Sequence, residues 1–556
     1  MNRTLDLTNL SAENTRRLNE IAVCHKRKYT EFVDKYSKRY GHDYMWWATP
    51  FSTRNISLDS TFRNICYLYL CQQIIFDDGN INHIVLGNKD LYDTLDLNYA
   101  KEMEKRKIKL EFNGTKYDIK YIIKRQLLGI YRQTKRIFRV KLYSGNKKIR
   151  TNDIISLIDT PMLSSSFKDG SYQDRYFTNI QKYVDREIYF VPDIIKNTSI
   201  SWKEYITYAK NSSKYRFVFK ENFYNLFDLF FLLRYSVYCL RRSLDKYEYD
   251  GLDVTPLIKD SFIRGSYCDC ALEGILDYQF VKHLQNSGVE VDNLISWYEG
   301  RPSEIMLQKA FRKYYPLAHS VGYEGFPLLE SSLSLYLSEE QVRQESAPLK
   351  MTVPGAVYER QAEQFYEKID LIKVPILRNK YANKSSNASL NQKKKILIVL
   401  PYFEKVAENM IHIVNEYMKI RYDALDIIIK NHPVFTGKTI DYYSKETISF
   451  QPQYVEGNLV ECMKDIDLAY ISCSTAAMEV ISQGAFLVNL CSAGELVNTG
   501  IPDSIDDELY RLVYDEKETF EAFDYCLQRE GRKINMLDVG ELFEPINEET
   551  INRMWN

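Results

Sequence analysis

Residues 395–401 of this 556-residue chain read KILIVLP, a run that is apolar on both faces of a strand. Three further largely apolar runs follow at residues 425–430, 467–471 and 485–490, and helical patterns separate them. Strands buried on both faces belong to parallel sheets, because crossover helices cover the two sides. The alternation therefore predicts a doubly wound, Rossmann-like lobe over residues 395–556.

The chain before residue 380 repeats this rhythm less regularly. Its strand-like runs are residues 83–87, 188–192, 294–298 and 317–323. A polar, Ser- and Asn-rich segment, residues 380–394, follows them and is interpreted as an interdomain linker. The sequence thus predicts an α/β protein with a Rossmann-like lobe over residues 1–379, a second one after the linker, and a cleft between the two.

Composition narrows the class of protein. The chain is 45% hydrophobic and 27% charged with a net charge of −1, so no overall field attracts it to nucleic acid, and no nucleic-acid partner is expected. Its ten cysteines form no CxxC pair, and most lie in apolar runs, as reduced core thiols do. The first residues show no signal-peptide pattern. We expect a cytoplasmic protein without disulfides or structural zinc.

Two segments depart from the α/β pattern. Residues 101–150 hold 17 Lys or Arg against 4 Asp or Glu, with apolar residues interleaved. They form either a solvated insertion in the N-terminal lobe or a basic amphipathic patch that rests on a polyanionic acceptor or on anionic headgroups at the inner face of the cytoplasmic membrane. Residues 222–245 are strongly apolar, but Asn225, Asp228 and Arg234 interrupt them, which favours a buried helix over a membrane span.

Candidate ligand-binding residues follow the strands of the C-terminal lobe, because open parallel sheets bind ligands at the carboxyl ends of their strands. Lys430, His432 and Pro433 end the second strand. The proline fixes the turn, the imidazole can donate to a phosphate or to the oxygen of a leaving nucleotide, and the lysine adds positive charge. A His-Pro turn without a ligand is the alternative.

A hydroxyl-rich turn follows the third strand. Ser472, Ser474 and Thr475 lead into a predicted helix, and a helix N-terminus with free amide groups favours phosphate. Glu479, one turn into this helix, can accept from a ribose or sugar hydroxyl, or it packs at the interface. We predict that these residues and the Lys430–Pro433 turn together bind a nucleotide.

Two carboxylates end strands of the N-terminal lobe. Glu299 follows the strand 294–298, and Glu324 follows the strand 317–323. A carboxylate at this edge suits general acid or base work on a hydroxyl acceptor, although a solvent-exposed loop residue is an equal alternative. With His432 they are the predicted catalytic residues.

Several signatures of other chemistries are missing from the sequence. It contains no P-loop, HExxH, GxSxG or GxGxxG motif, and no acid pair of the DxD kind ends an early strand. We therefore predict no bound metal and no cofactor. Charge on a leaving nucleotide would then be stabilised by His432, Lys430 and the predicted helix N-terminus.

The two C-terminal motifs, IIIKNHP at 427–433 and ISCSTAAMEVISQG at 471–484, resemble those of GT-B enzymes that use CMP-activated acidic sugars. These are Kdo transferases of capsule and O-antigen systems and bacterial sialyl- and polysialyltransferases. WWATPFS at 46–52, WYE at 297–299 and GYEG at 322–325, with PILR at 375–378, resemble surface-carbohydrate biosynthesis proteins. The chain differs from many relatives in having Glu324 where they carry a histidine, and it lacks the acidic-glycine motif of sialyltransferases.

The resemblance implies a metal-independent glycosyltransferase of bacterial surface polysaccharide synthesis. Its substrates would be a CMP-linked ulosonic acid, Kdo-like or sialic-like, and a glycan or lipid-linked glycan acceptor. His432 and the hydroxyls of Ser472, Ser474 and Thr475 would surround the phosphate, and Glu299 would match the catalytic carboxylate. Three alternatives remain open: a CDP-glycerol-type phosphotransferase, a nucleotide-sugar epimerase, and a non-catalytic glycan-binding or assembly protein on the same fold.

Overall fold

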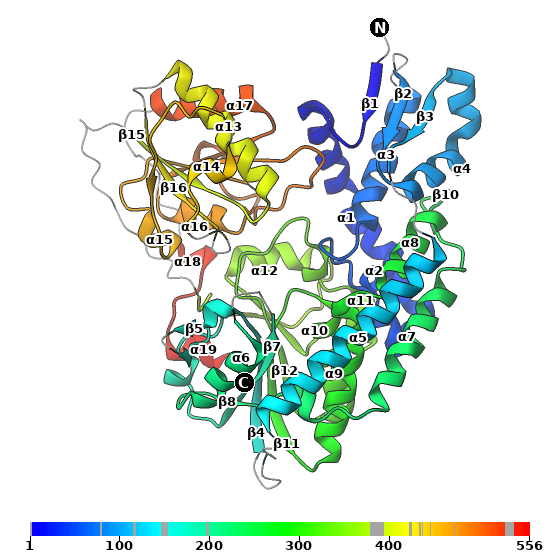
Figure 1. The fold of residues 1–556 in the computed structure, drawn as a ribbon, viewed down its shortest axis with the longest axis vertical. Coiled ribbons are helices and arrows are strands. Elements are labelled where there is room, and N and C mark those ends of the chain that lie inside the picture. Colours follow the sequence, from blue (N-terminus) through cyan, green and yellow to red (C-terminus); the bar gives the residue numbers. More distant parts are fainter. Residues whose placement is uncertain are drawn as a thin grey trace.

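The fold was analysed in a computed structural model of the whole chain. The structure describes residues 3–77, 81–114, 118–145, 149, 154–168, 170–195, 200–378, 394–421, 425–432, 435, 437–444, 446–472, 474–528 and 539–556. Three regions are visible in Figure 1: a C-terminal lobe in yellow and orange, a central lobe in cyan and green, and an N-terminal region in blue. Most of the predicted linker, residues 380–394, lies outside the described residues.

The C-terminal lobe is built on a six-stranded parallel sheet with the order β17-β16-β15-β18-β19-β20. Its strands are β15 (Lys394–Val399), β16 (Leu425–Lys430), β17 (Gln453–Tyr454), β18 (Leu468–Ser472), β19 (Phe486–Leu490) and β20 (Tyr510–Val513). Its helices are α13 (Glu404–Ile420), α14 (Ile440–Tyr443), α15 (Leu459–Cys462), α16 (Ala476–Ser482) and α17 (Glu516–Gln528). In chain order the strands run 3-2-1-4-5-6, the order of the dinucleotide-binding fold, so the Rossmann-like prediction is confirmed.

The apolar strands of this lobe are buried on both faces, as predicted. Ile396 and Ile398 pack into a core with α13 and α17, whereas Leu397 between them joins the core that contains α16. Successive side chains of a strand point to opposite faces, so a run without polar residues serves two cores at once.

The central lobe has the same strand order in a seven-stranded parallel sheet, β14-β13-β12-β11-β4-β7-β8. Its strands are β4 (Ile154–Met162), β7 (Ile188–Ile194), β8 (Arg216–Phe217), β11 (Glu290–Trp297), β12 (His319–Tyr323), β13 (Lys350–Val353) and β14 (Leu371–Lys373). Its helices are α6 (Trp202–Asn211), α7 (Asp228–Arg242), α8 (Thr255–Gly265), α9 (Asp269–Asn286), α10 (Pro302–Tyr314), α11 (Glu339–Arg343) and α12 (Ala356–Glu363). Two Rossmann-like lobes are thus present, as predicted.

The first 150 residues form more than the edge of this lobe. Strands β1 (Arg3–Asp6), β2 (Ile81–Leu86) and β3 (Lys109–Phe112) make a separate three-stranded parallel sheet. The accompanying helices are α1 (Ala12–Tyr40), α2 (Pro50–Thr53), α3 (Thr61–Asp77) and α4 (Lys89–Arg106). The run at residues 83–87 is therefore a strand, as predicted, but of this smaller sheet. The predicted insertion is not a loop, because it comprises the end of α4, β3 and the 26-residue helix α5 (Ile119–Ser144).

The C-terminal segment crosses back to the central lobe, so the predicted lobe 395–556 is too long at its end. Helices α18 (Val539–Leu542) and α19 (Glu548–Asn552) lie beside the seven-stranded sheet (Figure 1). The amide of Glu544 donates to the carbonyl of Pro354 at 2.8 Å, and Arg553 donates to the carbonyl of Lys373 at 3.1 Å. These contacts tie the end of the chain to β13 and β14.

A loop over residues 491–506 joins the two lobes near the cleft. The Glu330 carboxylate of the central lobe accepts from the amides of Thr499 and Gly500, at 2.9 and 2.7 Å, and from the Thr499 hydroxyl. Tyr358 donates to the carbonyl of Gly500 at 3.1 Å. Gly500 has φ +70°, a conformation that side chains beyond glycine rarely adopt.

The apolar segment 222–245 differs from its prediction. It contains helix α7 as expected, but only one side of this helix is buried, and seven large apolar residues along the segment are exposed. None of the described helices is both long and apolar enough to cross a membrane.

Candidate active site in the interlobe cleft

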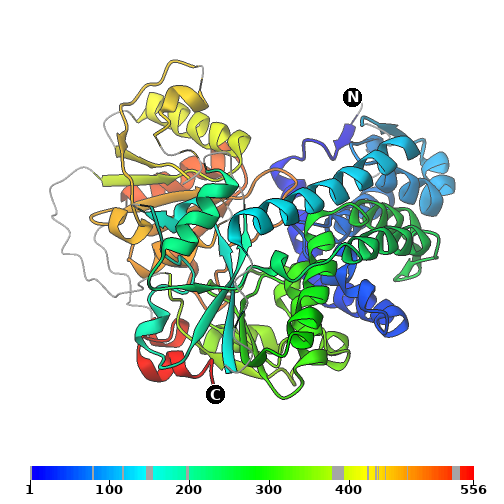
Figure 2. The ribbon, with the colours of Figure 1, turned by 60° about the horizontal axis from the view of Figure 1, so that its bottom comes forward.

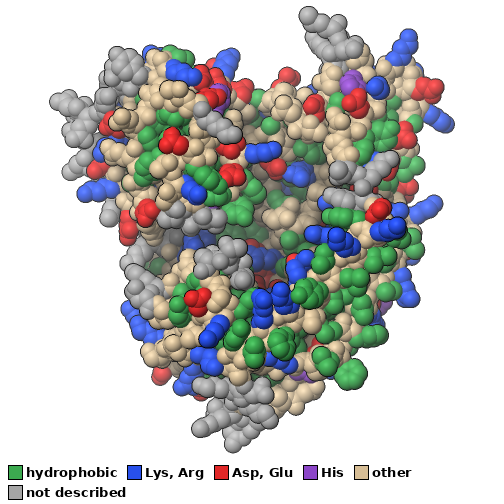
Figure 3. All heavy atoms as spheres, viewed as in Figure 1, with side chains coloured by type: hydrophobic (Ala, Val, Ile, Leu, Met, Phe, Trp, Pro, Cys, Tyr) green, Lys and Arg blue, Asp and Glu red, His purple; other side chains and the backbone are tan. Residues whose placement is uncertain are grey.

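A cavity of about 1110 Å³ at the carboxyl ends of the C-terminal strands lies between the two lobes. Tyr402 after β15, Lys430 and His432 after β16, and Ser474 and Thr475 after β18 line it on one side. The chain reverses its strand order between β15 and β18, which is where this fold binds its ligands. The hollow and the Lys and Arg side chains within it are visible in Figure 3.

The opposite wall of the cleft brings further positive charge. Arg175, in the loop after the short hairpin β5 (Phe167–Lys168) and β6 (Ser171–Tyr172), and Arg378, five residues beyond β14, both line it. The Arg378 guanidinium lies over the Trp297 ring at 5.6 Å, and its buried Nε has no hydrogen-bond partner among the described residues. With Lys430, the cleft thus has cationic groups from both lobes, which favours an anionic ligand.

His432 has an environment that keeps its imidazole neutral. Burial lowers the pKa of His432 from its ordinary 6.5, and the charges of Arg175 and Lys430 lower it further. The Tyr402 ring packs edge-on against the imidazole, with 5.5 Å between centroids. A neutral imidazole can donate one hydrogen bond to an oxygen in the cleft and accept another. The structure therefore places His432 where the sequence predicted it.

The hydroxyl-rich turn is only partly available to a ligand. Ser472 is buried and donates its hydroxyl to the carbonyl of Leu490 at 3.0 Å, so this side chain bridges β18 and β19. The Ser474 hydroxyl accepts from the amide of Ala476 at 3.2 Å. Thr475 forms no side-chain cap bond and lines the cleft. Because α16 has only seven residues, the helix adds less to anion binding than the sequence suggested.

Two other predicted nucleotide-binding residues have different outcomes. Glu479, one turn into α16, is buried and lines the cleft, and its role stays a prediction. Pro433 lies outside the described residues.

Glu299 lies in a smaller cavity of about 280 Å³ that adjoins the cleft. Arg378, Thr475 and Asn498 line both cavities, so the two are neighbours. One Glu299 oxygen accepts from the Trp297 indole at 2.8 Å, and the other accepts from Arg301 at 3.0 and 2.5 Å. A carboxylate oxygen offers about two lone-pair directions, so the oxygen bound to Trp297 keeps capacity to accept from a hydroxyl in the cavity, whereas the one bound twice to Arg301 does not.

A buried carboxylate fixes the turn that carries Glu299. Glu304, in the first turn of α10, accepts from the amides of Glu299 and Arg301 at 2.7 and 3.0 Å. Burial opposes the charge of Arg301, but the carboxylates of Glu299 and Glu304 outweigh it and raise the pKa of this arginine. Hydrogen bonds to Glu304 and the ion pair of Arg301 with Glu299 therefore hold the turn.

The second predicted catalytic carboxylate, Glu324, does not face the cleft. Its side chain is 1% exposed, and its amide donates to the Thr352 hydroxyl at 2.8 Å. Burial raises the pKa of Glu324 well above its ordinary range, so the group is held as a neutral acid. The turn after β12 folds into the core between β11 and β13, whereas the turn after β11 opens outward, and for this reason only Glu299 reaches a cavity.

A network of buried charges closes the other strand ends of the central lobe. Lys220 binds the Asp277 carboxylate at 3.0 Å, and Arg136 binds Glu273 at 2.5 Å. The cavity above Asp159, near the end of β4, has a volume of only about 10 Å³, and Lys220 and Asp277 line it. Burial raises the pKa of Asp159 to about 7. No ligand of sugar size fits here.

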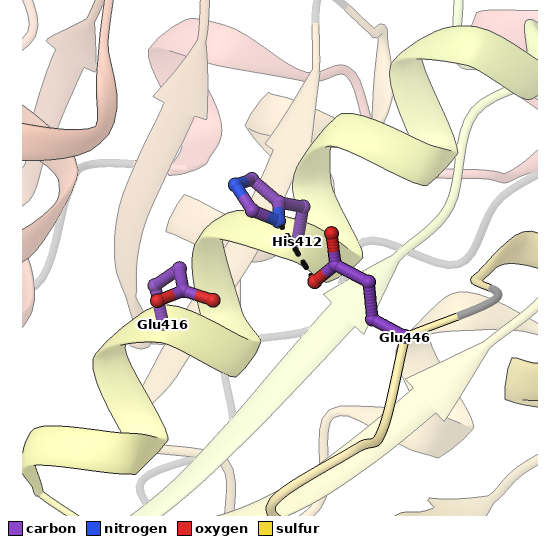
Figure 4. A group of neighbouring side chains, drawn as sticks. All are labelled: His412, Glu416 and Glu446. Atoms are coloured by element: carbon purple, nitrogen blue, oxygen red, sulfur yellow. Dashed lines mark hydrogen bonds and ion pairs between the residues drawn. The ribbon is translucent and has the colours of Figure 1, made fainter.

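One group among the described residues has the geometry to hold a metal ion, and it lies away from the cleft. His412 and Glu416 lie one turn apart on α13, and Glu446 approaches from the loop beyond α14 (Figure 4). The imidazole meets Glu446 at 3.2 Å, and Glu416 pairs with Lys419. These partly exposed side chains already form surface ion pairs, which explain the group without a metal.

Sequence reasoning missed several residues of the site. Arg378 ends the PILR motif, which the sequence marked only as a resemblance, because the strand β14 before it was not predicted. Arg175 follows a two-residue strand and has no sequence pattern that marks it. Glu304 was detectable as an acidic residue in the first turn of a helix that begins with proline.

No protein-family model matches the chain, and no curated protein matches its sequence. Among the solved structures that show a loose likeness are the following three. A trehalose-6-phosphate synthase from Burkholderia multivorans matches 72% of this chain and 95% of its own, with 10% identity and a TM-score of 0.38. A UDP-GlcNAc 2-epimerase from Methanocaldococcus jannaschii, in complex with UDP-GlcNAc and UDP, matches 72% of this chain and 98% of its own, with 12% identity and a TM-score of 0.39. A chain of a GtfA/B complex matches 50% of this chain, with 12% identity and a TM-score of 0.34, and only 59% of its own length is covered.

Proposed function

We propose that the chain is a glycosyltransferase that binds a nucleotide sugar in the interlobe cleft and transfers the sugar to a hydroxyl of a glycan. One observation carries the proposal: a cleft of about 1110 Å³ at the reversal of a Rossmann-type sheet, with positive charge from both lobes and a carboxylate in the adjoining cavity. A phosphate needs the positive charge, a sugar of one residue fits the smaller cavity, and an acceptor hydroxyl needs the carboxylate.

The nucleotide is placed on the C-terminal side of the cleft. Lys430 supplies charge to a phosphate, and neutral His432 donates a hydrogen bond to the oxygen that carries the leaving group. The glycosidic oxygen gains negative charge as its bond to the sugar breaks, so a donor already aimed at this oxygen stabilises the transition state more than the ground state.

The donor is proposed to be a CMP-linked acidic sugar, such as Kdo or a sialic-like ulosonic acid. Such a donor carries two anionic groups, one phosphate and one sugar carboxylate. Lys430 accounts for the first, and Arg378, which lines both cavities, is placed for the second. A neutral UDP-linked hexose would leave the Arg378 charge in the smaller cavity without an anionic partner from the sugar.

Glu299 is proposed to act on the acceptor. An acceptor hydroxyl in the smaller cavity donates to the Glu299 carboxylate and transfers its proton there as the new C–O bond forms at the anomeric carbon. The bond to the donor phosphate oxygen breaks, and CMP leaves with the electron pair. The acceptor is proposed to be a bacterial surface polysaccharide or its lipid-linked precursor, built in the cytoplasm.

The test is product formation with CMP-Kdo and CMP-sialic acid as donors and lipopolysaccharide or capsule fragments as acceptors. The proposal expects CMP release that depends on acceptor and a product that gains the sugar but no phosphorus. Glu299→Gln should lower the rate by at least a hundredfold, because general acid–base catalysis contributes about 10²–10⁴. Glu339→Gln, on the surface helix α11, is the matched control and should leave the rate unchanged.

The same assay separates the alternatives. A glycerophosphotransferase also releases CMP, from CDP-glycerol, but its product gains phosphorus. An epimerase forms a new sugar without any acceptor. Acceptor binding without release of any nucleotide would contradict the proposal and favour a non-catalytic glycan-binding protein. Independence from metal and cofactor stays a prediction, tested by activity in the presence of a chelator.

A further inference from the structure

Helix α5 exposes most of its large apolar side chains, and three of its five buried residues are polar. Its buried residues are Gln126, Gly129, Gln133, Val140 and Ser144. Its exposed apolar residues are Ile119, Tyr121, Ile123, Leu127, Leu128, Tyr131, Phe138 and Leu142. In a globular protein the apolar stripe of a surface helix normally faces the core. The packing of the fold therefore does not explain the outer face of α5.

Helix α7 and its flanks show the same feature. Leu226 and Phe227 are 84% and 83% exposed, and Phe230 is 64% exposed. The exposed apolar residues that continue this stripe are Leu233, Val237, Leu240 and Leu244. Their spacing of three or four residues places them on one face of the helix. The sequence indicated a buried helix here, and the structure instead leaves seven large apolar side chains of the segment exposed.

The two helices lie side by side and antiparallel. Near one end, Gln126 donates to the hydroxyl of Ser266, whose carbonyl accepts from Ser236 of α7. Near the other, Lys141 donates to the carbonyl of Tyr224, just before α7. Both views of the ribbon show the pair running together (Figure 2). In Figure 3 apolar side chains gather over both helices, with Lys and Arg among them. We call this surface the α5–α7 face.

The charge of the face has a single sign. Helix α5 contains eight Lys or Arg and no Asp or Glu. Lys120, Lys124 and Lys135 are exposed among the apolar residues and have no ion-pair partner within the described parts of the chain. Arg234 and Arg241 are exposed on α7. The face therefore combines exposed apolar side chains with unneutralised positive charge.

We propose that the α5–α7 face docks on a lipid bilayer that contains anionic headgroups, with both helices lying in the plane of the interface. Leu, Ile and Phe side chains would enter the boundary between headgroups and acyl chains, and the lysines would reach the phosphates. A protein partner fits less well, because the cores of protein interfaces are depleted in lysine. The proposal does not depend on the chemistry of the interlobe cleft.

The test is flotation of the full chain with vesicles of phosphatidylcholine, with and without phosphatidylglycerol. We expect at least tenfold tighter binding to the anionic vesicles and weaker binding as salt is raised. The triple variant Lys120→Gln, Lys124→Gln, Lys135→Gln should bind about a hundredfold more weakly, since each lysine near an anionic surface contributes about fivefold. Phe227→Gln with Phe230→Gln should lower binding by tenfold or more.

Matched variants on other surfaces control for fold and net charge. Lys38→Gln, Lys419→Gln, Lys517→Gln removes the same charge, and Leu97→Gln with Leu317→Gln removes exposed apolar side chains. Both should bind vesicles like the native chain, and all four variants should keep its melting temperature. Equal binding to both vesicle types, or equal losses in the control variants, would overturn the proposal. So would a dimer in sedimentation experiments that only the α5–α7 variants dissociate, because the face would then join two copies of the chain.

Discussion

The two Rossmann-like sheets share one strand order but differ at their carboxyl ends. In the C-terminal lobe the reversal between β15 and β18 opens into a cavity of about 1110 Å³. In the central lobe the equivalent reversal, between β4 and β11, ends above a cavity of about 10 Å³. There Lys220 and Arg136 pair with four carboxylates, and Glu299, just beyond β11, lines an open cavity.

The difference shows that a shared strand order does not by itself leave a cavity of ligand size at the point where the order reverses. The same edge of the same kind of sheet leaves an open cavity in one lobe and holds internal charge pairs in the other. A comparison of the two lobes therefore predicts which substitutions change activity and which change stability.

The largest effect is expected from His432→Ala in the C-terminal lobe, which has the larger cavity. Loss of the hydrogen-bond donor to the leaving group should lower turnover by about 10²–10⁴, while the melting temperature stays close to that of the native chain because the side chain is only half-buried. His412→Ala, on the outer face of α13, is the control and should keep full activity. Native turnover in the His432 variant would remove this residue from the site.

Lys220→Met, in the central lobe, should lower the free energy of unfolding by an amount comparable with the loss in activation free energy expected for His432→Ala. Removal of one partner from a buried ion pair leaves Asp277 and Glu273 uncompensated and typically costs about 3–5 kcal/mol. Thermal melting should show it, and nucleotide affinity of the folded chain should not change. Lys203→Met, at an exposed position of α6, should melt like the native chain. A loss of nucleotide affinity with native stability would mean that the network belongs to the ligand site.

The pH dependence of stability tests whether the buried Asp159 of the central lobe is protonated in the folded chain. Burial raises the pKa of Asp159 from 3.8 to about 7. Between these values the folded chain binds a proton that the unfolded chain has released, so stability falls as pH rises through this window. Asp159→Asn removes the titration and should gain stability over the native chain, by up to about 4 kcal/mol, on going from pH 4 to pH 8. A difference in melting temperature that is the same at both pH values would show that Asp159 is charged in the folded state.

A smaller effect is expected from Arg378→Ala at the junction of the two cavities. Hydrogen bonds to charged groups contribute about 1.5–3 kcal/mol, so the affinity for the donor should fall by roughly ten- to a hundredfold. Free CMP, which lacks the sugar carboxylate, should lose less. Arg421→Ala, whose partner is Asp524 on the surface of the C-terminal lobe, should leave affinity unchanged in a calorimetric titration. An equal loss for CMP and for the CMP-sugar would place Arg378 on the phosphate.

Much of the fold could be predicted from the sequence because hydrophobic periodicity reports burial. The strand 425–430 was placed without error, and 467–471 and 485–490 were placed within one residue. These strands are apolar on both faces, which few other structures permit. By contrast β4, an interior strand of the other sheet, was missed, since Asp159 and Pro161 interrupt its apolar pattern and only tertiary pairing accommodates them.

The candidate site was predicted where local sequence decides geometry. His432 and Glu299 each end a strand, so the fold rule alone places them at the binding edge. Glu324 satisfied the same rule, but the turn after it folds inward, and no local pattern reports that direction. Arg175 and Arg378 come from loops whose positions depend on the packing of both lobes. The exposure of α7 was missed for a related reason, because an apolar helix has the same sequence pattern whether protein or another apolar medium covers it.

The central claim is that the C-terminal lobe binds a nucleotide. It is tested most directly by measuring the melting temperature of the purified chain in the presence of CMP, CDP, UDP or GDP. A ligand at about 100 times its dissociation constant stabilises the folded state by roughly 2.7 kcal/mol, which gives a clear rise in melting temperature. The account predicts a rise with CMP that is larger than with the other nucleotides and is lost in His432→Ala. A larger rise with CDP, UDP or GDP would keep the site and contradict the donor. No rise with any of the four would contradict the claim itself.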